Sequence, residues 1–153
     1  MRNTVIEEKL KKGESCVLTV EGTSMLPFLR PKEDQVVIVP FSGVVKKYNV
    51  LLYVRENGQY VLHRVVKKKR DELWMRGDHQ YTVERNILPS SCIGRLEGTW
   101  KNAGSKKERY VRENDVVHRV EVALWFFSFF PRKLAWHTWR ALYRLISRKK
   151  RHS

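Results

Sequence analysis

A short stretch near the N-terminus, Gly22-Thr23-Ser24-Met25-Leu26-Pro27-Phe28-Leu29, places a single serine between a glycine and a proline. It follows the apolar run 16–20, whose composition is typical of a β-strand. Gly22 permits a sharp turn at the end of that strand, and Pro27 prevents the chain from continuing as strand or helix. The pattern therefore predicts a turn that holds the Ser24 hydroxyl at an edge of the fold, although a serine in such a turn is often only a turn residue.

Outward from this turn, a series of β-rich runs predicts one compact, mainly β domain over residues 1–98. Asn57-Gly58 lies between two of these runs and predicts a hairpin. Before the first strand, apolar residues at helical spacing predict a short helix that ends at Gly13. Cys16 and Cys92 both fall in apolar strand-like runs, and we expect them to be reduced core residues rather than a disulfide.

The composition changes after residue 98. The polar, Gly-, Ser- and Lys-containing segment 99–113 is typical of a linker, and residues 114–153 are expected to form a basic, amphipathic helical tail. Asn114 or Asp115 is a suitable cap for a first helix, and Pro131 is suited to the first position of a second one.

The second helix of this tail divides into two unequal faces when residues are placed at 100° steps. Basic side chains occupy a narrow arc, while a wider arc carries leucine, isoleucine, tryptophan and tyrosine. This profile is typical of a helix that lies in a membrane interface. Packing of the wide arc against the rest of the protein is the alternative, which explains the aliphatic residues equally well and the aromatic residues less readily.

The chain carries a formal net charge of +15, which favours a polyanionic partner. An anionic membrane surface that binds residues 114–153 is the preferred partner. Nucleic acid is less favoured, because no helix-turn-helix or zinc-finger pattern is present. The 42% apolar content excludes wholesale disorder, and the sequence does not determine the oligomeric state.

Three further residues, one histidine and two acids, indicate that Ser24 is a candidate nucleophile and not only a turn serine. An alcohol needs a neighbouring base to act as a nucleophile, and His63, in the β-rich run 60–66, can take up a proton near neutral pH. A histidine base also needs an acceptor on its second ring nitrogen, and two acids follow it, Asp78 and Glu84. Either acid can serve, or can be a turn or surface carboxylate. Met25 and Gly22 are expected beside the substrate.

A lysine base is the alternative to His63, with Lys67, Lys68 and Lys69 as candidates. A catalytic lysine must lose its solvation to be neutral at pH 7, and three adjacent lysines beside Arg70 are more typical of a solvated charge run. The histidines and cysteines show no metal-ligand spacing, so the sequence predicts neither a metal nor another cofactor.

The residue runs 22–27, 62–66, 76–80 and 93–95 together resemble the signal peptidase I superfamily, which also includes the self-cleaving LexA-type repressors. The resemblance covers roughly residues 16–98 and implies a coiled β-sheet peptidase domain. Most bacterial members use a serine and a lysine, whereas the endoplasmic-reticulum-type branch has histidine at the lysine position, which His63 matches. In that branch an acid shortly after the Gly-Asp motif orients the histidine. Glu84 matches that acid, and Asp78 matches the motif aspartate.

The chain departs from the family in three respects, one of which is Tyr48-Asn49, where many relatives carry Gly-Asp before the strand that starts near Val50. Gly22 stands where many signal peptidases have a serine that helps to bind the oxyanion, and no transmembrane anchor precedes Ser24. The short form resembles relatives linked to the maturation of modified peptides. It implies a cytoplasmic serine peptidase, peripheral to the inner face of the membrane, that cleaves a peptide or leader precursor. A catalytically inactive module on the same fold, which binds nucleic acid or anionic lipid through its tail, is the competing hypothesis.

Overall fold

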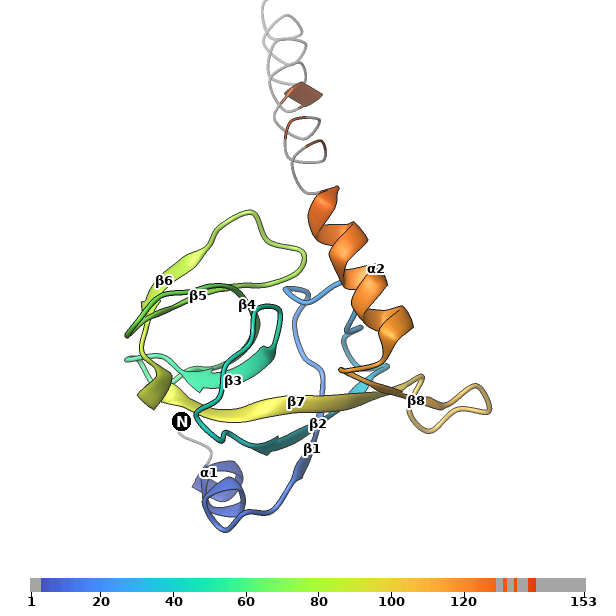
Figure 1. Cartoon of the computed structure of the whole chain (residues 1–153). Helices are drawn as coiled ribbons and strands as arrows, with labels where there is room; N and C mark the ends of the chain where they lie inside the picture. Colours follow the sequence, from blue (N-terminus) through green and yellow to red (C-terminus); the bar gives the residue numbers. More distant parts are fainter. Residues whose placement is uncertain (1–3, 129–130, 132–133, 135–137, 140–153) are drawn as a thin grey trace, which may run out of the picture. The chain divides into compact units, whose positions relative to one another are not determined.

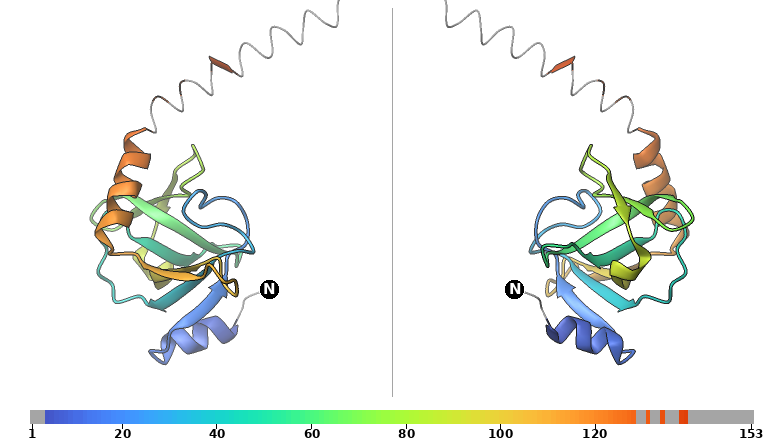
Figure 2. Two further views of the ribbon diagram at one scale, coloured as in Figure 1. Left: turned by 90° about the vertical axis from the view of Figure 1, so that its right-hand side faces the viewer. Right: turned by 90° about the vertical axis from the view of Figure 1, so that its left-hand side faces the viewer.

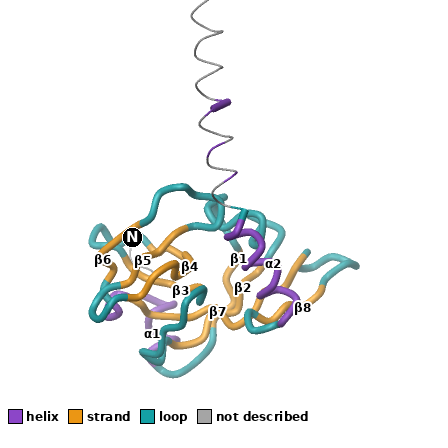
Figure 3. The backbone as a smooth tube through the Cα atoms, turned by 45° about the horizontal axis from the view of Figure 1, so that its top comes forward, coloured by secondary structure: helices purple, strands orange, loops and turns teal. Residues whose placement is uncertain are grey.

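The computed structural model describes residues 4–128 and, beyond them, residues 131, 134, 138 and 139. The chain divides into two units, Met1–Asp115 and Val116–Ser153. Their regular elements are α1 (Thr4–Lys11), β1 (Cys16–Thr19), β2 (Gln35–Pro40), β3 (Val50–Val54), β4 (Tyr60–Lys68), β5 (Leu73–Arg76), β6 (Glu84–Ile87), β7 (Cys92–Lys101), β8 (Arg109–Arg112) and α2 (Val116–Phe127). Figure 3 colours them by type and shows that strands dominate the first unit, as the sequence predicts.

The strands of the first unit form one antiparallel sheet in the order β1-β2-β7-β3-β4-β5-β6, with β8 also paired to β7. The long strand β7 is the centre of this arrangement. β2 pairs along one edge of it, while β3 pairs with its first half and β8 with its second half on the other edge. Because of these pairings, β7 joins the β1–β2 part of the sheet to the β3–β6 part, and Figure 1 shows it running between them.

The sheet curls because its pairing is interrupted. Register shifts occur in four pairings: β2 with β7, β3 with β7, β4 with β5, and β5 with β6. Such irregularities bend a strand and increase its twist. Glycine also allows close approach at Gly94, where a Cβ atom would lie 2.4 Å from a methyl group of Ile38. The β3–β6 half of the sheet therefore turns back on itself.

Two hydrophobic clusters fill this curled sheet. One includes Leu10 of α1 and Met25 of the loop after β1, so the helix and the serine-bearing loop share a core. In agreement with this, α1 lies beside β1 and β2 in both views of Figure 2. The other cluster is built mainly from β3, β4 and β5, includes Tyr53 and Met75, and extends to Val45 and to Cys92 of β7. Cys16 and Cys92 are buried free thiols, as predicted, and they belong to different clusters.

The local predictions agree with these elements where the structure describes them. The chain leaves α1 through Gly13 at a φ of 84°, and Gly58 lies at a φ of 80° in the turn of the β3–β4 hairpin. The α2 helix begins directly after Asp115, one of the two residues that the sequence offered as its cap. The basic and apolar arcs of the predicted second tail helix lie almost wholly outside the described residues.

Residues 99–113 are not the linker that their composition indicated. They contain the end of β7 and all of β8, and the first structural unit extends to Asp115. The polar residues form the tip of a hairpin, where Asn102 and Gly104 adopt positive φ angles. Trp100 and Tyr110 flank that tip with ring centroids 4.8 Å apart, so an aromatic pair across the two strands stabilises the hairpin.

Candidate active site

Ser24 lies in the loop that connects β1 to β2. The two ends of this loop are joined by a backbone hydrogen bond of 3.0 Å from the N–H of Val20 to the carbonyl of Asp34. Within the loop, Met25 and Leu29 are both 3% exposed and belong to the hydrophobic cluster beneath it. The loop is therefore anchored on both sides of Ser24, whose own side chain remains partly accessible.

His63 lies in the middle of β4, and its side chain is buried at 2% exposure. Two side chains contact its Nδ1 atom. The Tyr53 hydroxyl is 3.2 Å away, and the nearer oxygen of Glu84, Oε1, is 3.3 Å away. Tyr53 also donates a 3.0 Å hydrogen bond to the other oxygen of Glu84. Strands β3, β4 and β6 thus each contribute one member of a connected chain of polar groups, in which Tyr53 and His63 are buried and Glu84 is partly exposed.

The electrostatics of this chain determine the protonation of His63. Burial lowers the pKa of His63 to about 4, and the charge of Arg55 acts in the same direction, while Glu84 opposes both. Burial alone would raise the pKa of Glu84, but hydrogen bonds from Arg55 and Tyr53 hold it below its usual value. At pH 7 the imidazole is therefore neutral and the carboxylate ionised.

A neutral imidazole beside an ionised carboxylate carries its proton on the nitrogen that faces the carboxylate. We assign this proton to Nδ1 of His63 from the hydrogen-bond pattern, because Glu84 can only accept there. The opposite ring nitrogen, Nε2, then keeps a lone pair that can accept a proton. This is the protonation state that a general base requires.

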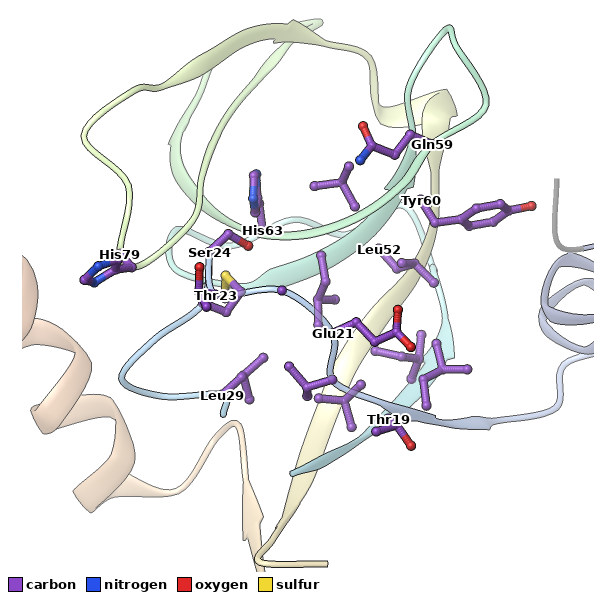
Figure 4. A pocket seen from close by; sticks show the side chains of 18 of the residues that line it. Thr19, Glu21, Thr23, Ser24, Leu29, Leu52, Gln59, Tyr60, His63 and His79 are labelled. Carbon is purple, nitrogen blue, oxygen red and sulfur yellow. The ribbon is translucent and has the colours of Figure 1, made fainter. Parts of the chain in front are cut away.

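Ser24 and His63 line the same pocket, which has a volume of about 730 Å³. In the close view of Figure 4 their side chains lie next to each other, with His63 of β4 above Ser24 in this view. No hydrogen bond joins the two side chains among the described residues. Catalytic hydrogen bonds are commonly long before a substrate is bound, so this spacing is compatible with proton transfer in a complex.

Asp78 has a different partner from Glu84. Its two carboxylate oxygens accept hydrogen bonds of 2.9 Å each from Nε and Nη2 of Arg64, the residue that follows His63. The remaining Nη1 of Arg64 donates to Glu113 at 2.8 Å and to the carbonyl of Tyr48 at 2.9 Å. The two acids that the sequence left as alternatives are thus separated by geometry, since Glu84 contacts His63 and Asp78 is paired to Arg64.

The turn that carries Asp78 lies directly against Ser24. The N–H of His79 donates a 2.8 Å hydrogen bond to the Ser24 carbonyl. A Cβ atom added at Gly77 would lie 2.6 Å from that carbonyl oxygen and 2.9 Å from the Ser24 Cβ atom. Only glycine permits this approach, so the Gly77-Asp78 turn holds the backbone of Ser24 in place.

Gly22 and Met25 both line the pocket. Gly22 has a φ of 74°, a conformation that side-chain-bearing residues rarely adopt. A serine hydroxyl at that position would therefore require a strained backbone or a different turn. The Ser24 backbone N–H donates no hydrogen bond within the described part of the chain, which leaves it available to an oxyanion. Met25 contributes an apolar wall.

The lysine alternative is disfavoured by position. Lys67, Lys68 and Lys69 are exposed at the end of β4, and none of them lines the pocket that contains Ser24. Instead, Lys67 and Lys69 lie over the ring of Trp74, with Nζ 4.8 Å and 5.0 Å from its centroid. They form a solvated charge run, as their sequence indicates.

Sequence reasoning did not identify Tyr53, Arg55, Arg64 or Glu113. One signal was available for Tyr53, because the Asn57-Gly58 hairpin pairs Val54 with Tyr60 and so brings Tyr53 and His63 to neighbouring positions on one face. Glu113 gave no such signal, since it contacts Arg64 only through the tertiary fold.

Comparison of the chain with family models, curated proteins and solved structures found no match. The resemblance to signal peptidases therefore rests on the quoted motifs. Among the described residues, no helix has the length and apolar character needed to cross a bilayer.

Proposed function

We propose that this protein is a serine endopeptidase of the signal-peptidase type, with Ser24 as nucleophile and His63 as general base. The observation that carries this proposal is the environment of His63. A buried, neutral imidazole has an ionised carboxylate on Nδ1 and lines the pocket that contains Ser24. A structural histidine in a β-sheet core needs no such orientation toward a serine, whereas a catalytic base does.

The reaction follows from these positions. Nε2 of His63 takes the Ser24 hydroxyl proton while Oγ bonds to the carbonyl carbon of the scissile peptide bond, and the charge develops on the carbonyl oxygen. The Ser24 N–H can stabilise that oxyanion. The imidazolium, held by Glu84, then gives its proton to the leaving amine as the C–N bond breaks. Water activated by the same imidazole hydrolyses the acyl-enzyme ester and regenerates both residues.

The pocket supports a peptide substrate. Apolar side chains form one part of the pocket wall beyond Ser24, including those of Leu18, Val20, Met25, Leu29, Ile38 and Leu52. The pocket also borders β1, the first strand in the sheet order, which pairs only with β2 among the described strands. An extended peptide can add to such an edge by main-chain hydrogen bonds and place an apolar side chain in the pocket.

An active-site-directed phosphonate probe, followed by peptide mapping, tests the proposal. We expect wild-type protein to be labelled at Ser24, and Ser24→Ala and His63→Ala to remain unlabelled. Ser42→Ala, which alters an exposed loop serine, is the matched control and should label normally. A wild-type protein that neither reacts at Ser24 nor cleaves any member of a peptide library would refute the proposal and leave the non-catalytic binding module.

A further inference from the structure

The helix α2 carries a continuous apolar stripe that is open to solvent. Five large apolar side chains on this helix are more than half exposed, and Phe127 reaches 90%; they are Val116, Val117, Val120, Leu124 and Phe127. At 3.6 residues per turn they fall within an arc of roughly 100°. Two described residues beyond the helix, Leu134 and Trp139, are 67% and 62% exposed. Exposed apolar side chains gathered on one face mark a site of interaction.

The chemistry of the surrounding sequence identifies the partner. Residues 122–153 contain eight Lys or Arg residues and no Asp or Glu, together with eight aromatic residues. Cations favour a surface of negative charge, and tryptophan and tyrosine favour the boundary between water and hydrocarbon. The apolar stripe also needs an apolar environment, which a lipid bilayer provides and the phosphate backbone of a nucleic acid does not.

A second copy of the chain is less suitable as the occupant of this face. Pairing two identical tails would bring the cations of both copies together without any acidic residue in residues 122–153 to offset them. We infer that the exposed face of α2 is a docking surface for an anionic lipid bilayer. This inference is independent of the proposed peptidase activity.

Flotation of the full-length protein with phosphatidylglycerol/phosphatidylcholine vesicles tests the docking surface. We expect binding that weakens at high salt and is weak with vesicles of phosphatidylcholine alone. Replacing two side chains of the stripe (Leu124→Ser with Phe127→Ser) should weaken vesicle binding by at least about tenfold for each side chain removed from the bilayer. Val44→Ser with Leu88→Ser is the matched control, since these exposed apolar residues lie in the first unit and should bind as wild type.

The Ser24→Ala variant should float as well as wild type, so loss of peptidase activity and loss of docking are distinguishable. Vesicle binding unchanged by the Leu124 and Phe127 substitutions would overturn the inference. So would equal binding to vesicles of either composition. Light scattering tests the alternative that a second copy of the chain covers this face. A wild-type protein that forms dimers and does not bind vesicles, with dimers that dissociate in the double variant, would assign the face to a second copy.

Discussion

Substitution of Glu84 by glutamine tests the candidate active site most directly, because it removes one charge and keeps the shape of the side chain. On the proposed mechanism His63 becomes an imidazolium when it takes the Ser24 proton, and Glu84 lies 3.3 Å from its Nδ1. At that distance an ion pair with an effective dielectric constant near 20 is stabilised by about 5 kcal/mol. Arg55 already neutralises part of the Glu84 charge, so the net effect is smaller. We therefore expect acylation of Ser24 to slow by roughly 10²- to 10⁴-fold.

The assay is the second-order rate of labelling of Ser24 by the phosphonate probe, measured from pH 3.5 to pH 8. Because burial lowers the pKa of His63 to about 4, the wild-type rate should stay level as the pH falls from 8 to 5 and decline only near pH 4. An unperturbed histidine would already lose activity below about pH 6.5. Glu84→Gln should lower the labelling rate between pH 5 and pH 8. It should not move the acid decline of that rate to higher pH, because Glu84 is the group that raises the pKa of His63.

Glu72→Gln is the matched control, since it makes the same chemical change at a carboxylate that is hydrogen-bonded to Lys69 and Trp74 and does not line the pocket. It should label at the wild-type rate. If Glu84→Gln reacted within threefold of wild type across this pH range, while Ser24→Ala remained unlabelled, the assignment of Glu84 as the partner of the base would be refuted.

Three further predictions concern the groups around the serine. Gly77→Ala should slow probe labelling at least about tenfold and lower the free energy of unfolding by about 1–3 kcal/mol, because its Cβ would overlap the backbone and Cβ of Ser24; unchanged labelling and stability would contradict the close approach. Asp78→Asn removes one of the two carboxylates that pair with the buried Arg64, so the free energy of unfolding, measured by urea denaturation, should fall by about 3–5 kcal/mol. A decrease below about 1 kcal/mol would contradict a buried ion pair. Unfolded His63 binds a proton near pH 6.5 and the folded form only near pH 4, so wild-type stability should fall by about 3 kcal/mol more than that of His63→Gln between pH 7 and pH 4; parallel pH profiles would contradict this.

The two acids of the site illustrate how similar residues acquire different roles. Glu84 is partly exposed on β6 and keeps an ionised carboxylate against the imidazole. Asp78 is fully enclosed and paired with Arg64, whose pKa is raised because its two carboxylate partners outweigh the effect of burial. On the proposed mechanism Glu84 acts on the base, whereas Asp78 and Arg64 act on the nucleophile by holding the turn that contacts Ser24.

Local features of the fold were predictable because neighbours along the chain determine them. The α1 helix ends near a glycine that accepts a positive φ, and Asn57-Gly58 forms the turn that joins β3 to β4. Composition was a poorer guide at residues 99–113, where polar residues form a hairpin tip instead of a linker. A polar run has the same composition in both cases, and only the pairing of its flanking strands distinguishes them.

The residue types of the candidate site, a serine in a turn and a histidine followed by two acids, could be read from the order of the motifs alone. The choice between Asp78 and Glu84 could not, because both lie within about 20 residues of His63 and are chemically alike. In the tertiary structure β4, β5 and β6 curl so that Glu84 contacts Nδ1 of His63, while Asp78 pairs with Arg64 on the same strand as His63. Sequence patterns report which side chains share a local face, whereas contacts across a bent sheet depend on bulges and on burial that no single segment encodes.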